Sequence, residues 1–392
     1  MKELTLEDVC QKITDGAHFS PKACEDGKFP MFSVKDMQEY GFSYENCKYV
    51  SDEDYQKLLN SGCVPEVGDV LVAKDGSYLK HIFVVNEKRE EAILSSIAIF
   101  RPNELILSEY LLYVLKNPVM KRIISDNYVS GSALPRIVLK DFRKIKLKVP
   151  GLDIQQKVVS ILGSIDKKID LNNKLNANLE ELMKAQFVKE FVTNNSINYM
   201  KSLYDMADFI NGAAFKKDEY AQEGLPIIKI AELKNGVTDS TQYFNGKKDD
   251  KYFIYDREIL FSWSGNPDTS IDTFIWTGGE AILNQHTFRV LPKDNEEVYI
   301  YLLLKYHKPI FAEIARNKQT TGLGHVTVAD LKRLTFAYDE SKIKEFCIRM
   351  QPVYDRFILS MFENKKLSSI RDTLLPRLML GQVELGDVTL EI

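Results

Sequence analysis

The chain has 392 residues, of which 44% are hydrophobic and 28% are charged, and its formal net charge is −4. This length allows two or more domains, each with its own buried core. The charge balance excludes a uniformly basic nucleic-acid binder, because phosphate neutralisation supplies much of the affinity of such proteins. Any DNA-binding cations must therefore be clustered or supplemented by a partner.

The cysteine and hydropathy patterns further narrow the class of protein to which this chain can belong. The five cysteines form no C-x-x-C pair, so the sequence predicts neither a zinc site nor a disulfide framework. The N-terminal segment has no apolar signal core, and the chain has no run of 18 apolar residues. We therefore expect no signal peptide, no membrane-spanning helix and a location in the reducing cytoplasm.

The first part of the chain predicts a mixed α/β domain. Brief apolar or β-branched runs bounded by Gly, Pro, Asp and Asn predict strands at residues 30–34, 70–73, 82–85 and 97–100. Residues 108–116 have the pattern of a short amphipathic helix. Residues 139–145 begin as another helix, and a strand then leads to Pro150.

After Pro150 the pattern changes to one long helix of about 35 residues, roughly 50 Å in length. Asn172 lies on its apolar stripe, where a polar residue costs stability but can fix the register. Apolar residues recur every three or four positions, as in a coiled-coil seam, and they are Ile154, Val158, Ile161, Ile165, Ile169, Leu175, Leu179 and Leu182.

The rest of the chain repeats this order. Residues 130–137 and 139–145 resemble residues 319–326 and 328–334, which lie 189 positions later. A unit this long is not a solenoid repeat, whose units have about 20–50 residues, so the sequence indicates a duplicated globular domain plus helix. The alternative is two unrelated α+β domains that share common strand patterns. The other matched segments, in the same order in both halves, are 29–34 with 225–230, 68–72 with 257–261, 76–77 with 265–266, 97–102 with 287–292 and 110–118 with 301–309.

The second copy ends in a second long helix. An amphipathic helix of this length cannot bury its own stripe, and its simplest partner is the first helix. Because a whole globular domain connects the two, an antiparallel pairing closes easily. The alternative is that each helix packs only on its own domain. The expected pairing residues of the second helix are Ile343, Phe346, Met350, Val353, Phe357, Met361, Leu367, Ile370 and Leu374.

The predicted fold class is α+β. Two tandem globular α/β domains are separated by two long helices that form an antiparallel coiled coil, and the halves are related by a pseudo-two-fold internal repeat. The expected limits are 1–150 for the first globular domain, 151–195 for the central helix, 196–338 for the second domain, and 339–392 for the C-terminal helix and tail.

The motifs of common enzyme sites are absent from the sequence. It contains no G-x-x-x-x-G-K-[ST] loop, no G-x-S-x-G elbow and no H-E-x-x-H pair. Asp69 and Lys74 resemble part of a nuclease cluster, but the second copy has Glu258 and Trp263 there. A structural role is therefore favoured. The five histidines are scattered, so we expect a non-catalytic chain without a metal site.

Several motifs in one order resemble the specificity (S) subunit of type I restriction–modification enzymes, over essentially the whole chain. The second copy departs from the pattern, because Lys344 and Glu345 replace the glutamine pair and Asp339 replaces Pro150; this leaves the start of the second helix open. Residues 149–150, 154–157 and 165–169 are similar to the family's central "P…Q…I…L…ID..I" run, residues 374–383 to its "LLP.LM.G.I" ending, and the turns at 131–132 and 321–322 to the closing segments of its target recognition domains.

The resemblance implies a function for the chain. Each target recognition domain would read one half of a split, asymmetric sequence in double-stranded DNA from the major groove, and the helices would set the unread gap. Two methyltransferase subunits would dock on the helices, and an ATP-driven restriction and translocation subunit would join them. S-adenosylmethionine, ATP and Mg²⁺ would then belong to the partner subunits, with no cofactor in this chain.

The candidate DNA contacts lie on glycine-containing loops at matching places in the two copies. Base readout needs donors such as Arg, Lys, Asn and Gln, and hydroxyl groups can position the backbone. The alternative is that these are ordinary solvated loop residues. The candidates are Lys74, Ser77, Tyr78, Lys80, Ser130, Ser132 and Arg136 in the first copy, and Lys229, Trp263, Ser264, Asn266, Gln285, His286, Thr320, Thr321 and His325 in the second.

Two other functions stay open. The chain could serve a system, similar to types IIG and IIB, in which one partner polypeptide both cuts and methylates. It could also be a duplicated scaffold that binds no DNA. Salt-dependent DNA binding separates the second of these from the restriction systems.

Overall fold

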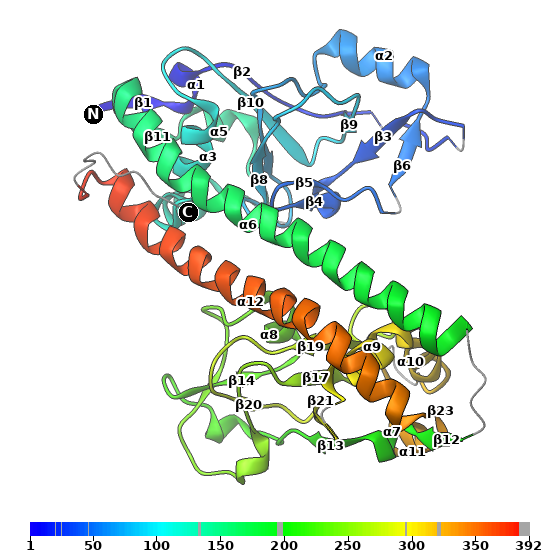
Figure 1. The fold of residues 1–392 in the computed structure, drawn as a ribbon. Coiled ribbons are helices and arrows are strands. Elements are labelled where there is room, and N and C mark those ends of the chain that lie inside the picture. The colour runs from blue at the N-terminus through cyan, green and yellow to red at the C-terminus, as the bar shows by residue number, and fades with distance from the viewer. Residues whose placement is uncertain are drawn as a thin grey trace. The chain divides into compact units, whose positions relative to one another are not determined.

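The computed structural model describes all residues except 20, 25, 46, 132–134, 194–198, 295, 320–322 and 384–392. The chain divides into two compact units. The first unit comprises Met1–Asp170 and Leu367–Ile392, and the second comprises Leu171–Lys366. In Figure 1 the globular part of the first unit runs from blue to cyan, and that of the second from green to yellow. Each long helix contributes to both units, and the domain limits expected from the sequence stay a prediction.

The first unit is built around an antiparallel sheet of four strands. Its order is β2 (Cys10–Asp15), β10 (Ile97–Pro102), β7 (Val70–Ala73) and β8 (Ile82–Val84). All four residues of β7 are buried, because both faces of the sheet are covered. Val70 and Val72 face a core that includes α3 (Ser108–Lys116), whereas Leu71 and Ala73 face a second core around Phe32.

Smaller elements complete the first unit. Three strands form a second sheet in the order β6 (Lys48–Val50), β3 (Phe29–Phe32) and β9 (Ala92–Ile93), and Tyr55 stacks on Phe29 with ring centroids 3.9 Å apart. The remaining elements are β1 (Lys2–Thr5), α1 (Leu6–Val9), the 3-10 turn Val34–Asp36, β4 (Met37–Gln38), β5 (Gly41–Phe42), α2 (Asp52–Ser61), α4 (Pro118–Tyr128), α5 (Leu139–Arg143) and β11 (Lys146–Val149).

The second unit repeats this topology. Its main sheet has the order β13 (Ala207–Asn211), β21 (Thr287–Pro292), β17 (Ile259–Ser262) and β19 (Asp272–Ile275), again fully antiparallel. β14 (Leu225–Ile228) pairs antiparallel with β15 (Tyr243–Phe244) and parallel with β20 (Ala281–Leu283), as β3 does with β6 and β9. The duplication expected from the sequence is therefore present in the strand order.

The other elements of the second unit follow the same plan, and the covering helices α9 and α10 take the places of α3 and α4. These elements are the π-helical turn Val188–Thr193, β12 (Met200–Ser202), α7 (Leu203–Met206), the 3-10 turns Lys217–Glu219 and Asp250–Tyr252, α8 (Ile230–Asn235), β16 (Phe253–Ile254), β18 (Ser264–Gly265), α9 (Glu297–Tyr306), α10 (Lys308–Asn317), β22 (Gly324–His325), α11 (Val328–Arg333) and β23 (Thr335–Ala337).

The two long helices are α6 (Leu152–Phe187) and α12 (Glu340–Met379), and they pair antiparallel. In the first unit, Arg371 donates to Asp166 at 2.9 Å. In the second unit, Asn172 donates to Asn364 at 2.9 Å and to Glu363 at 2.8 Å. Contact positions on α12 fall as those on α6 rise, which is the signature of an antiparallel pair.

Asn172 is almost fully buried, with 3% of its surface exposed. Its side-chain amide is satisfied by the facing helix, as a polar residue on a seam requires. The position expected to fix the register is therefore confirmed as a buried, hydrogen-bonded seam residue.

The two helices begin in different ways. Near the start of α6, the buried Gln155 accepts from the amide of Leu107 at 2.9 Å and donates to the carbonyl groups of Leu105 and Pro150 at 2.9 and 3.0 Å. At α12, Asp339 accepts from the amide of Lys342 at 3.0 Å, which caps the free amides of the first turn. The substitutions at 339 and 344 thus replace one anchor by another and leave the helix intact.

Three expected pairing residues lie outside the buried stripe. Ile154, Leu182 and Ile370 are 37%, 45% and 40% exposed. A straight helix of 3.6 residues per turn drifts away from a 3.5-residue seam, and the fully buried Met183 takes the place next to Leu182. The other members of the stripes are buried or half-buried: Val158, Ile161, Ile165, Ile169, Leu175 and Leu179 on α6, and Ile343, Phe346, Met350, Val353, Phe357, Met361, Leu367 and Leu374 on α12.

The long helices also pack on the globular cores. Val158 and Leu162 of α6 join the core of the first unit, and Met183 and Phe187 join that of the second. The helices therefore pair with each other and also pack on the globular cores, so packing on a domain alone is excluded. Burial against a domain widens the apolar face beyond a strict coiled-coil seam.

Candidate nucleic-acid interface

Three loops of the first unit converge at one end of its main sheet. The amide of Lys74, just after β7, donates to the carbonyl of Ser96 at 3.0 Å. The amide of Ile137 donates to the carbonyl of Lys74 at 3.0 Å, and that of Gly76 to the carbonyl of Pro135 at 2.8 Å. The loop after β7 and the segment around Arg136, which the sequence singled out separately, thus form one surface.

The second unit brings the matching loops together in the same way. The amide of Trp263 donates to the carbonyl of His286 at 3.3 Å, and that of Val326 to the carbonyl of Trp263 at 2.8 Å. Ser264 pairs with His325 in the short β18–β22 ladder. Lys229 lies beside this cluster, because the amide of Asn284 donates to the carbonyl of Ile228 at 3.0 Å.

A fourth loop joins each cluster, and the sequence reasoning missed it. The amide of Ala17 donates to the carbonyl of Ile93, and that of Ala213 to the carbonyl of Leu283, each at 2.8 Å. A Cβ atom on Gly16 or Gly212 would overlap a carbonyl oxygen of the neighbouring strand end, so both positions require glycine. The signal was available as Asp-Gly-Ala at 15–17 and Asn-Gly-Ala at 211–213.

An ionic cluster occupies the centre of the first interface. Asp15, which is 2% exposed, lies 3.4 Å from the Lys74 ammonium group and 2.7 Å from Nε2 of His18. Lys74 is also 3.4 Å from Asp75 and is only 9% exposed. The Lys74 ammonium group is thus paired with carboxylates inside the loop cluster, and its contact with DNA stays a prediction.

A different pair occupies the same place in the second unit. The indole Nε1 of Trp263, the counterpart of Lys74, donates to Oδ1 of Asn211 at 3.0 Å. Asn211 ends β13 as Asp15 ends β2. One scaffold position therefore holds a charged pair in one unit and an aromatic–amide pair in the other.

The remaining candidates differ in exposure. Ser77, Lys80, Ser130, Arg136, Asn266 and His286 are exposed, whereas Tyr78, Lys229, Ser264, Gln285 and His325 are partly buried. Ser132, Thr320 and Thr321 lie outside the described residues. Contact of each candidate with DNA stays a prediction.

Asp69 has a structural role. It is fully buried, and both its oxygens accept from the Arg101 guanidinium at 2.8 Å. In the second unit, Glu258 accepts in the same way from Arg289, at 2.8 and 2.5 Å. The duplicated ion pair joins adjacent strands of each main sheet. Across the described part of the chain, no group of three His, Cys, Asp or Glu residues is arranged to hold a metal ion.

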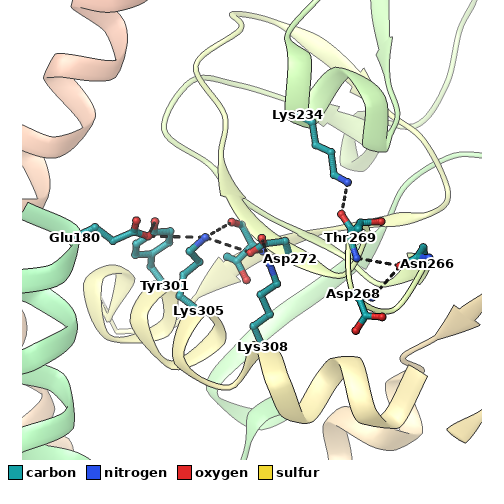
Figure 2. Close-up of polar contacts among 10 residues, drawn as sticks. Glu180, Lys234, Asn266, Asp268, Thr269, Asp272, Tyr301, Lys305 and Lys308 are labelled. Carbon is teal, nitrogen blue, oxygen red and sulfur yellow. Dashed lines mark hydrogen bonds and ion pairs between the residues drawn. The ribbon is translucent and has the colours of Figure 1, made fainter. Parts of the chain in front are cut away.

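A polar network links β19, α9 and α10 of the second unit to α6 (Figure 2). Tyr301 donates to Glu180 at 2.8 Å, and Asp272 lies 3.2 Å from Lys305 and 2.6 Å from Lys308. Burial alone would raise the pKa of Asp272, but the two lysines outweigh burial and hold it below its usual value. In the first unit, Tyr113 of α3 donates to Asp166 of α6 at 2.9 Å. Each candidate interface thus belongs to a unit whose core is hydrogen-bonded to a long helix.

Among the described residues, no helix has the length and apolar character needed to cross a lipid bilayer.

Comparisons with known proteins agree with this architecture. The MjaIX type I restriction enzyme specificity subunit of Methanocaldococcus jannaschii is 25% identical, over 73% of this chain and 72% of the relative. The HindI specificity subunit of Haemophilus influenzae is 21% identical, over 81% of this chain and 86% of the relative. The crystal structure of a type I restriction-modification S subunit from M. genitalium has the same fold, with a TM-score of 0.56 at 15% identity over 99% of this chain and 96% of that chain.

The family model described as "Type I restriction modification DNA specificity domain" matches residues 1–181 and 197–338, which is more than half of the chain. This chain therefore belongs to the family of type I restriction–modification DNA specificity subunits.

Proposed function

We propose that this chain gives a type I restriction–modification complex its DNA sequence specificity, with the globular part of each unit reading one half of a two-part, asymmetric site. The observation that carries this proposal is the pair of matched loop clusters. They stand on the same strand order, but their centres differ: Asp15 and Lys74 in one, Asn211 and Trp263 in the other. Equal scaffolds with unlike surfaces suit two unlike half-sites.

The proposal extends to the partner subunits of this complex and to the cofactors that they hold. Two methyltransferase subunits dock along α6 and α12, and restriction–translocation subunits complete the complex in the cytoplasm. S-adenosylmethionine, ATP and Mg²⁺ are held by those partners. The net charge of −4 supports this division of labour, because partner subunits that share the phosphate contacts relieve this chain of a uniformly basic surface.

Methylome sequencing of the source strain with and without this gene tests the proposal. We expect methylated adenine at one split, asymmetric motif to disappear on deletion, because the methyltransferase loses its only sequence reader. A palindromic motif would contradict two unlike half-sites. An unchanged methylome, together with a purified complex whose DNA binding does not weaken as salt rises, would favour the scaffold without DNA.

A further inference from the structure

A basic hollow of about 430 Å³ lies beside the candidate interface of the first unit. Tyr78, Leu79 and Lys80, from the loop after β7, form one side of it. The other side comes from α4 and is formed by Lys121, Arg122, Ser125 and Asp126. Because Tyr78 and Lys80 belong to both surfaces, the hollow is continuous with the loops expected to meet DNA.

The loop side of the hollow is held in place by its backbone. Leu79 is 2% exposed and has a φ of 56°, a left-handed conformation that is costly for leucine. Its amide donates to the carbonyl of Ala73 at 2.8 Å, and the amide of Lys80 donates to the carbonyl of Ser77 at 3.1 Å. The buried Leu79 side chain therefore fixes the two residues on either side of it.

The charges around the hollow are unbalanced. Lys80, Lys121 and Arg122 supply three cations, against the single carboxylate of Asp126. Within the described part of the chain, none of these three cations forms a side-chain hydrogen bond or an ion pair. The Tyr78 and Ser125 hydroxyl groups lie 3.1 Å apart, so one hydroxyl proton remains available to a ligand.

The surroundings of Lys121 also favour an anion in the hollow. Burial and the neighbouring Lys116 lower the pKa of the Lys121 ammonium group. The carboxylates of Glu39 and Asp372 act in the opposite direction, and an anion in the hollow would further favour the charged form of Lys121.

The second unit lacks this arrangement among its described residues. With Pro118 of α4 matched to Pro309 of α10, Ala312 and Glu313 stand where the first unit has Lys121 and Arg122. The nearby Arg316 is paired with Asp268 at 2.6 Å.

The matching loop of the second unit, residues 266–269, is held by hydrogen bonds within the loop (Figure 2). Oδ1 of Asn266 accepts from the amides of Asp268 and Thr269 at 3.0 and 3.1 Å. Lys234 donates to the carbonyl of Thr269, which stands where the first unit has Lys80. The difference between the units is therefore one of charge and of loop shape.

We propose that the hollow seats one phosphodiester group of the DNA backbone, so that the first unit is anchored on the duplex by a contact that the second unit does not make. Guanidinium, ammonium and hydroxyl donors are the groups that bind phosphate oxygens. Such a contact positions the domain and carries no sequence information. This inference rests on the proposed function and names a specific ligand group for one of its two surfaces.

The test uses the full chain assembled with its methyltransferase subunits. Binding to a duplex with the methylated motif and to an unrelated duplex is measured against salt for wild type, Lys121→Gln and Arg122→Gln. The matched control is Lys48→Gln, an exposed lysine on β6 outside the hollow. It removes the same charge from the same unit.

We expect Lys121→Gln and Arg122→Gln each to reduce the slope of log affinity against log salt by about 1, because one phosphate contact is lost. Both duplexes should weaken by the same factor, and the methylated motif should not change. The control should keep the wild-type slope. Slopes equal to the control, or an altered motif, would overturn the phosphate seat.

Neutral methylphosphonate linkages, introduced one at a time, locate the contact. At one linkage, the wild-type complex should bind the modified duplex more weakly than the unmodified duplex. The Lys121→Gln complex should bind these two duplexes equally well. The absence of any such linkage overturns the inference. If Lys121→Gln does not assemble, the exposed Arg122→Gln gives the same test.

The outcomes also separate this inference from the function on which it rests. A wild-type complex that methylates no motif overturns the proposed function, and the phosphate seat falls with it. A complex with a clear motif and unchanged slopes overturns the phosphate seat alone.

Discussion

Two pairs of equivalent positions distinguish the two recognition surfaces at the scale of single residues. Asp15 forms an ion pair with Lys74 and a hydrogen bond with His18, whereas Asn211 holds Trp263 by one neutral hydrogen bond. A buried carboxylate is stable only while its cationic partners stay in place, so the first loop cluster depends on charge. The second depends on the packing and orientation of an indole.

One substitution in each unit tests whether the two loop clusters depend on these different interactions. Asp15→Asn keeps the side-chain size but removes the charge that pairs with Lys74, and Asn211→Ala removes the acceptor of the Trp263 indole. We expect each variant to relax the bases accepted in one half-site only, with a loss of discrimination of about 1–3 kcal/mol. Methylome sequencing of strains that carry each variant measures this directly. If Asp15→Asn relaxed the bases accepted at both half-sites equally, the idea that each loop cluster reads one half-site would be contradicted.

At the scale of elements, the pairing of α6 with α12 depends on its register. They pair through polar as well as apolar groups: Asn172 donates to Asn364, and the Ser360 hydroxyl donates to Asn176 at 2.5 Å. Apolar contacts tolerate sliding along a seam, but a hydrogen bond between buried side chains is satisfied at one register only. These pairs specify the alignment of the two helices within the second unit.

A double-mutant cycle on Asn172 and Asn364 measures this specification. Asn172→Leu should destabilise the chain by about 1–2 kcal/mol, because it leaves the Asn364 acceptor without its donor. Adding Asn364→Leu should recover part of that loss, since two apolar residues then face each other. The measurement is chemical unfolding of each variant. Additive effects of the two substitutions would show that the pair is not coupled.

Asp272 links β19 to α9 and α10, and its titration gives a pH prediction. Its folded pKa lies below the ordinary value of 3.8. Its contribution to stability is therefore fully present above about pH 4 and is lost as pH falls through the lowered pKa. Asp272→Asn should reduce stability at neutral pH and flatten the acid limb of the stability curve. Thermal melts between about pH 2 and 7 measure this.

The exposed Asp239 provides the control for the Asp272 experiment. Asp239→Asn should leave the acid limb unchanged, because no ion pair is removed. If Asp272→Asn also retains the wild-type acid limb, the two lysines do not stabilise its charged form.

At the scale of the whole molecule, duplication explains both likeness and difference. The strand order, the Gly-Ala loops and the ion pairs Asp69–Arg101 and Glu258–Arg289 occur once in each unit. These features hold the scaffold and tolerate little change. The loop centres and the basic hollow differ, because surface loops can vary without loss of the core.

The sequence by itself determined the duplicated order, the two long helices, the seam position of Asn172 and the family resemblance. These follow from local periodicity and from repetition, which are properties of neighbouring residues along the chain. Only the tertiary structure decided that Lys74 is neutralised by Asp15, that Met183 rather than Leu182 is buried, and that Lys80 and Lys121 share a hollow. Each of these depends on segments far apart in sequence that meet only when the sheets and helices pack.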